Sequence, residues 1–247
     1  MEVKLTDCYT LSEGKALMSG TEALVRLLLE QSRIDRMNGL RTKGLVSGYP
    51  GSPLGGLDIA LGKAKSFLDE EGIYFQPAVN EELAATALWG SQHINLYDNP
   101  SVQGVFSMWY GKGPGLDRAM DALRHANQGG VAPHGGMVIA VGDDPTGKSS
   151  TLAYQSDQNF HSLGIPYFFP KNVSEIIPMG LEAFALSRYS GCCVGLKIVV
   201  DTADSNAVVD MSRLRPNFPK MKPNKLVHVT KHDPAGARES KLHEIRL

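Results

Sequence analysis

The sequence predicts a doubly wound α/β fold, in which a mainly parallel β-sheet carries helices on both faces. The main observation is that short apolar runs alternate with amphipathic runs of helical spacing along the first 212 residues. Strands that are joined through helices run parallel, with right-handed crossovers. A second observation is the glycine content, 26 of 247 residues, which predicts many tight turns where the backbone approaches a neighbour closely.

The first half of the chain holds three predicted helices and three predicted strands. Leu24, Leu27 and Leu28 lie on one stripe of the first helix, and Asn80 is a suitable N-cap for the third. That third helix is expected to bury Leu83, Ala84, Ala87 and Leu88. In chain order the elements are a helix over 21–32, a strand over 44–49, a helix over 57–68, a strand over 73–79, a helix over 81–95 and a strand over 102–109.

The second half repeats this alternation. Pro178 predicts a kink or a delayed start in the last helix, because proline removes a main-chain donor. The elements are a helix over 116–127, strands over 137–141 and 165–169, a helix over 173–189 and a strand over 194–200. A sheet covered on both faces explains why these strands read as continuous apolar runs.

The composition changes after residue 212. Residues 213–247 hold nine basic and three acidic side chains together with four prolines, and they show no clear periodicity. This pattern predicts one domain over 1–212, followed by a basic, proline-containing linker over 213–247 towards a further domain.

Composition also excludes several classes of protein. No run of 18 apolar residues is present, so no membrane span is expected, and the N-terminus lacks the apolar core of a signal peptide. A cytoplasmic protein is therefore expected. With 25 basic and 26 acidic residues, nothing indicates nucleic-acid binding. The three cysteines, Cys8, Cys192 and Cys193, lack the spacing of zinc or iron–sulfur ligands, so reduced thiols and no metal site are expected.

Ligands of an open parallel sheet bind outside the carboxyl ends of its strands. Five loops are expected at that edge, and three of them are rich in glycine. They cover residues 48–56, 80–82, 111–115, 142–150 and 201–206.

One of these loops matches a phosphate-binding motif. Residues 142–149 read G-x-x-x-x-G-K-S, the spacing of a P-loop, so a nucleotide-hydrolysing enzyme is one alternative. Asp143 and Asp144 weigh against it, since two carboxylates would repel a polyphosphate. The segment after Ser150 is polar and does not read as the apolar helix that such a loop opens.

A second candidate is the carboxylate pair at the start of the third helix. Glu81 lies in the first turn, where the helix dipole stabilises an anion, and Glu82 points about 100° away around the helix axis. An ordinary capping carboxylate is the alternative interpretation.

Five segments within residues 21–212 together carry a family resemblance. They are GYPGSPLGGLD (48–58), NEELAATALWGSQ (80–92), MWYGKGPGLDRAMDALRHAN (108–127), GDDPTGKSSTLAYQSD (142–157) and ALSRYSGCCVGLKIVVDT (185–202). In this order they resemble the long-chain indolepyruvate ferredoxin oxidoreductases, within the thiamine-diphosphate-dependent 2-oxoacid:ferredoxin oxidoreductases. The resemblance implies the domain that binds the aminopyrimidine ring of thiamine diphosphate.

The resemblance also implies roles for individual residues. Glu81 is expected to hydrogen-bond N1′ of the aminopyrimidine, with Glu82 as the second choice, and Ser52 and Lys112 to bind the substrate carboxylate. Asp143, Asp144, Gln155 and Asp157 receive no chemical role, and the G-K-S match is accidental on this interpretation. The residues expected to line the cofactor are Tyr49, Pro50, Gly51, Ser52, Gly113 and Gly115.

The implied reaction is oxidative decarboxylation of an aryl 2-oxoacid such as indolepyruvate, with coenzyme A as acyl acceptor and ferredoxin as electron acceptor. The chain has no cysteine quartet for iron–sulfur clusters and no G-D-G…N signature for Mg²⁺ and diphosphate. Those parts are expected in a downstream domain or another subunit, within a homodimer. This chain alone is expected to be inactive, and a non-catalytic module of the same fold remains an alternative.

Overall fold

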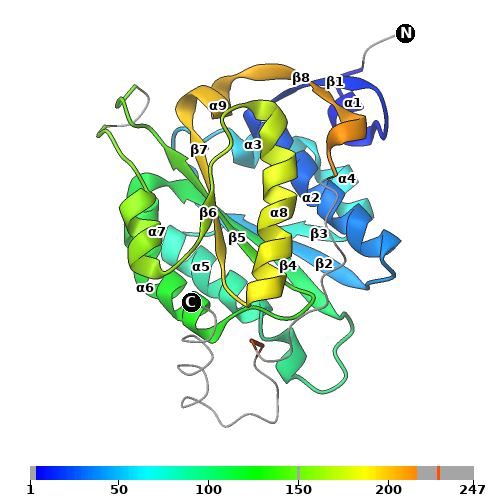
Figure 1. Cartoon of the computed structure of the whole chain (residues 1–247), viewed down its shortest axis with the longest axis vertical. Coiled ribbons are helices and arrows are strands. Elements are labelled where there is room, and N and C mark those ends of the chain that lie inside the picture. The colour runs from blue at the N-terminus through cyan, green and yellow to red at the C-terminus, as the bar shows by residue number, and fades with distance from the viewer. Residues whose placement is uncertain (1–3, 149–150, 216–226, 229–247) are drawn as a thin grey trace.

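A six-stranded parallel sheet forms the centre of the computed structural model, which describes residues 4–148, 151–215 and 227–228 (Figure 1). The strand order is β3-β2-β4-β5-β7-β6, and all five neighbouring pairs are parallel. The predicted fold class is confirmed. The strands are β2 (Thr42–Gly48), β3 (Ile73–Phe75), β4 (Gly104–Lys112), β5 (Met137–Asp143), β6 (Tyr167–Phe168) and β7 (Val194–Val199).

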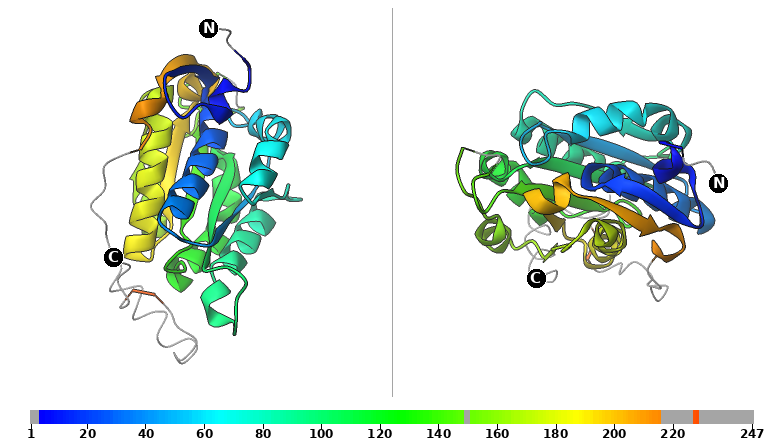
Figure 2. Two further views of the ribbon diagram at one scale, coloured as in Figure 1. Left: turned by 90° about the vertical axis from the view of Figure 1, so that its right-hand side faces the viewer. Right: turned by 90° about the horizontal axis from the view of Figure 1, so that it is seen from above.

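Helices cover both faces of this sheet (Figure 2). On one face lie α2 (Gly20–Met37), α3 (Leu57–Lys63), α4 (Lys65–Glu70) and α8 (Val173–Ser190). The other face carries α5 (Glu81–Ser91), α6 (Gly113–Gly129) and α7 (Asp157–Leu163). Each layer packs on its own buried apolar cluster, as expected for strands that are buried on both sides.

A small antiparallel ribbon joins the two ends of the domain. β1 (Lys15–Ser19) pairs with β8 (Asn206–Asp210), so that Ala16 lies opposite Val209. Two short helices, α1 (Asp7–Thr10) and α9 (Val200–Asp204), flank the ribbon, and the 3₁₀ turns are η1 (Ile94–Leu96) and η2 (Met211–Arg213). None of these elements was predicted from the sequence.

Several predicted boundaries were wrong. The strand expected over 73–79 ends at Phe75, and the helix expected over 57–68 is divided at Ala64 into α3 and α4. α8 begins at Val173 and includes Pro178, so the start of this helix is not delayed. In α5 the buried apolar residues are Ala84, Ala85 and Leu88, whereas the predicted Leu83 and Ala87 are exposed.

The region expected to be a linker is described only in part. Leu214 is buried, and Nε of Arg215 donates to Oε2 of Glu30 across 3.0 Å. Further on, His228 is buried between the main-chain oxygens of Val131 and Arg188, at 2.8 and 2.9 Å from its two ring nitrogens. Residues 216–226 and 229–247 lie outside the described part, and the predicted domain division stays a prediction. None of the described helices is long and apolar enough to span a bilayer.

Candidate functional site

The chain path singles out the carboxyl ends of β2 and β4. The connection after β2 leads to α3 on one face of the sheet, whereas β4 leads directly into α6 on the other face. Neighbouring strands whose connections diverge in this way mark the ligand-binding point of open α/β sheets. Most of the residues that were expected to form the site lie on these two connections or on α5, which follows the next strand, β3.

Glu81 is the first residue of α5. The side chain of Asn80 caps this helix by accepting a hydrogen bond from the Leu83 main-chain nitrogen across 2.9 Å. Glu81 is only 6% exposed, whereas Glu82 is exposed. Of the two candidate carboxylates, Glu81 is therefore the one held against the protein, and Glu82 points to solvent.

Gly115, in the first turn of α6, provides the surface against which the Glu81 side chain packs. A Cβ placed on Gly115 would lie 2.8 Å from Oε1 and 2.9 Å from Cγ of Glu81. Real Cβ atoms do not approach other atoms so closely, so any side chain at this position would displace the carboxylate. Gly115 was expected to allow close approach of a cofactor, and the close approach in the structure is to Glu81.

The Glu81 carboxylate receives no hydrogen bond from any of the residues that the structure describes. Among the described residues, the one cation within 4 Å of it is Arg118, whose Nε lies 3.9 Å from Oε2, beyond hydrogen-bond range. Neither oxygen is among the fully enclosed atoms that lack a partner, and the side chain is 8% exposed, so solvent reaches the carboxylate. Glu81 thus offers an acceptor, and a place to hold a proton, to an N–H group from outside the chain.

The loop after β2 lies across the ends of the neighbouring strands. The Tyr49 main-chain nitrogen donates to the Tyr110 carbonyl across 3.2 Å. Gly51 rests on the aliphatic stem of Lys112, since a Cβ on Gly51 would lie 2.8 Å from Cδ of that lysine. The structure therefore brings Gly51 and Lys112 together. Tyr49 and Pro50 are exposed, and Ser52 is half-buried.

The segment 111–115 is not the loop that was expected. Gly111 and Lys112 complete β4, where Lys112 pairs with Gly142 of β5. Gly113 begins α6, and its Cβ direction is filled by the ring of Tyr154. Tyr154 donates from its hydroxyl to Oδ1 of Asp117 across 2.7 Å. No sequence pattern identified Tyr154, because its partners lie about forty residues earlier in the chain.

A second polar cluster lies at the carboxyl ends of β5 and β7. Oδ2 of Asp143 accepts hydrogen bonds from the main-chain nitrogen and the hydroxyl of Ser156, at 2.7 and 2.8 Å. The buried Lys197 lies between this carboxylate, at 3.6 Å, and that of Asp157, at 2.5 Å. Burial raises the pKa of Asp143. Burial also opposes ionisation of Asp157, but the hydrogen bonds from Lys197 and Tyr167 hold its pKa below the usual range.

Lys197 was missed by the sequence analysis, because one lysine in an apolar strand leaves the pattern of that strand unchanged. The cluster connects the start of α7 to β5 and β7, so its role is structural. Gln155 is exposed and makes no described side-chain hydrogen bond. Among the residues with described positions, no group of three or more His, Cys, Asp or Glu side chains is arranged to hold a metal ion.

The geometry of residues 142–148 does not fit a phosphate-binding P-loop. Oδ1 of Asp144 accepts a hydrogen bond from the Lys148 main-chain nitrogen across 3.0 Å, and the Asp144 carbonyl accepts one from Gly147 across 3.1 Å. Donors that would have to cradle a phosphate are therefore bonded within the loop. The described residues 151–156 are not helical, and α7 begins only at Asp157.

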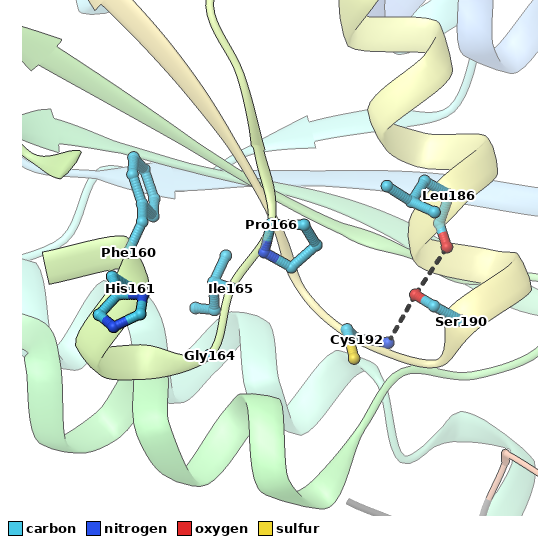
Figure 3. Close-up of a pocket in the computed structure, with 8 residues that line it drawn as sticks. All are labelled: Phe160, His161, Gly164, Ile165, Pro166, Leu186, Ser190 and Cys192. Atoms are coloured by element: carbon cyan, nitrogen blue, oxygen red, sulfur yellow. Dashed lines mark hydrogen bonds between the residues drawn. The ribbon is translucent and has the colours of Figure 1, made fainter. Parts of the chain in front are cut away.

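A groove lies at the opposite edge of the sheet, before β6 and β7 (Figure 3). Its volume is about 390 Å³, and its walls are mainly apolar. Ser190 lies at one end, where it donates to the Leu186 carbonyl across 2.8 Å. None of the predicted site residues lines this groove, and it plays no part in the site around Glu81.

Comparison with known proteins connects this chain to one group of enzymes. No family model matches the sequence. The chain is 27% identical over 214 residues to indolepyruvate oxidoreductase subunit IorA of Methanothermobacter marburgensis, covering 86% of this chain and 31% of that protein. It is 28% identical over 219 residues to the IorA subunit of Pyrococcus abyssi, covering 86% of this chain and 29% of that protein.

A solved structure shares the fold. It is the 2-oxoglutarate:ferredoxin oxidoreductase from Magnetococcus marinus with 2-oxoglutarate, coenzyme A and succinyl-CoA bound, at a TM-score of 0.59 and 18% identity over 83% of this chain and 32% of that one. The chain is thus a distant relative of IorA. It spans about a third of the length of the relatives that it matches.

Proposed function

We propose that this chain forms the aminopyrimidine-binding part of a thiamine-diphosphate-dependent oxidoreductase. Its proposed substrates are aryl 2-oxoacids such as indolepyruvate. The observation that carries the proposal is the Glu81 carboxylate, which is almost buried at the carboxyl edge of the sheet and receives no hydrogen bond from the described residues. The distant relationship to IorA subunits supports the choice of enzyme class.

The chemistry of Glu81 fits the aminopyrimidine. A carboxylate is an acceptor only, so it pairs with an N–H donor, and a protonated ring nitrogen such as N1′ is one. Thiamine diphosphate, when bound, supplies a carbon nucleophile for decarboxylation of the 2-oxoacid. Glu81 would hold the proton at N1′, and Gly115 would keep the carboxylate in place by leaving room for it.

The neighbouring residues would complete one wall of the site. Lys112 would attract the carboxylate of the 2-oxoacid, and Ser52 would donate a hydrogen bond to it. The support for placing them together is that Gly51, next to Ser52, rests on the Lys112 side chain. The backbone around these residues would face the cofactor, through Tyr49, Pro50, Gly51, Gly113 and Gly115.

Other parts of the enzyme would come from outside these 247 residues. We place there the residues that hold Mg²⁺ and the diphosphate, the iron–sulfur clusters, and the contacts with coenzyme A and ferredoxin. The relatives are about three times as long as the matched region, which leaves room for such parts. We further propose that the assembled enzyme is a homodimer.

Binding of thiamine diphosphate with Mg²⁺, measured by calorimetry on the assembled protein, tests the proposal. We expect Glu81→Gln and Glu81→Ala to weaken binding, with Glu82→Gln as the matched control that leaves it unchanged. A non-catalytic module predicts no cofactor binding in any variant. Equal binding by all variants, or ATP binding that depends on Lys148, would overturn the proposal.

A further inference from the structure

Arg118 is the one cation that approaches the proposed cofactor carboxylate within the described structure. It lies in the second turn of α6, and its Nε is 3.9 Å from Oε2 of Glu81. The Arg118 side chain is 63% exposed, whereas that of Glu81 is 8% exposed. No described hydrogen bond fixes the guanidinium, so Arg118 is able to swing into solvent at little cost.

The two oxygens of Glu81 are in different positions. Oε1 lies over Gly115, at the place where a Cβ would collide with it. Oε2 points towards Arg118. A donor that takes the place of Arg118 beside the carboxylate therefore meets Oε2.

We propose that Arg118 is a positioning residue that competes with the aminopyrimidine for Oε2 of Glu81. This inference rests on the proposed function. Without cofactor, the guanidinium compensates the charge of an almost buried carboxylate, which is otherwise costly to leave unpaired. When the ring nitrogen approaches, Arg118 turns away. Breaking its contact with Glu81 lowers the apparent affinity for the cofactor. Arg118 thereby keeps Glu81 compensated in the empty site.

The competition makes a specific prediction about cofactor affinity. Calorimetric titration of the assembled protein with thiamine diphosphate and Mg²⁺ gives the Kd. We expect Arg118→Gln to lower the Kd about two- to fivefold, the range for loss of a weak ion pair. Arg118→Lys keeps the charge, so its Kd should lie between those of wild type and Arg118→Gln. Lys63→Gln removes an exposed cation of α3 and is the control for net charge.

A double variant separates competition from a general charge effect. In the Glu81→Gln background the competed carboxylate is gone, so a further Arg118→Gln change should leave the Kd unchanged. If Arg118→Gln lowers the Kd equally in both backgrounds, the inference is overturned. Unchanged or weaker cofactor binding by Arg118→Gln alone overturns it as well. If wild type and Glu81→Gln bind equally or not at all, the proposed function fails as well. If the Kd depends on Glu81 but is unchanged by Arg118→Gln, the inference is overturned and the proposed function is not.

Discussion

The Trp109 indole of β4 donates a hydrogen bond from Nε1 to the main-chain carbonyl of Glu81, across 3.0 Å. This bond connects the strand that leads into α6 with the first turn of α5, which are the two elements that carry Lys112 and Glu81. Trp109 is completely buried. The main chain of the proposed catalytic residue is therefore fixed by the core and not only by the cap of its own helix.

Replacing Trp109 by Phe should destabilise the protein. The change removes the donor to Glu81 and leaves a cavity in a buried cluster, and together these cost about 1–3 kcal/mol. Urea unfolding measures the difference. Trp89→Phe is the matched control, because Nε1 of Trp89 has no hydrogen-bond partner in the described structure. Equal losses for the two variants would contradict a role for the Trp109 bond.

Replacing Gly115 by Ala should affect the cofactor more than the fold. The new Cβ collides with Oε1 and Cγ of Glu81, atoms of a side chain that is able to move. We expect the free energy of unfolding to change by less than about 1 kcal/mol, because alanine is also the better helix former. Binding of thiamine diphosphate should weaken.

The control for Gly115 lies in α5. A Cβ on Gly90 would meet no atom within 4 Å, so Gly90→Ala should stabilise the protein by about 0.5–1 kcal/mol and leave cofactor binding unchanged. Comparison of unfolding curves and titrations for the two variants checks both statements. Unchanged cofactor binding by Gly115→Ala would show that the Glu81 position is not critical.

The ion pair between Lys197 and Asp157 should make stability depend on pH. The pKa of Asp157 is lowered in the folded state, so its stabilising contribution is present at neutral pH and is lost as the pH falls from about 4 through the folded value. The difference in unfolding free energy between wild type and Asp157→Asn should therefore shrink between pH 6 and about pH 3. Asp204→Asn, at an exposed residue with no described ion pair, is the control. A constant difference for Asp157→Asn would rule out this contribution.

The three cysteines should resist modification in the folded protein. All three are buried and outside disulfides, and burial raises the pKa of Cys8 to about 11. Because thiolates are the reactive species, a thiol reagent at pH 8 should label none of them until a denaturant is added. Rapid labelling of one cysteine in the native protein would contradict the described burial.

Sequence patterns predicted the central sheet well, because each strand that is buried on both faces is a distinct apolar run. They failed at the β1–β8 ribbon, where Leu17 and Val208 face solvent. Its two short strands pair although almost the whole sequence of the domain lies between them. The continuation of β4 to Lys112 was missed because it depends on pairing with Gly142.

The candidate site likewise contains features that local sequence predicts and features that depend on the tertiary fold. Local information predicted that Glu81 lies in the first turn of a helix capped by Asn80, which the structure confirms, whereas its proposed role came from the family resemblance. Its surroundings were not found, because Trp109, Gly115 and Arg118 meet it only through the fold. Single residues such as Lys197 leave no periodic signal, so one sequence by itself does not reveal them.

Turnover of the assembled enzyme tests the central claim most directly. The measurement is the rate at which indolepyruvate reduces ferredoxin in the presence of coenzyme A, with saturating thiamine diphosphate and Mg²⁺, for wild type, Glu81→Gln and Glu82→Gln. We predict that Glu81→Gln lowers kcat about 10²-fold or more, the usual range for loss of an acid–base group, and that Glu82→Gln retains the wild-type rate. Wild-type turnover by Glu81→Gln would contradict the account.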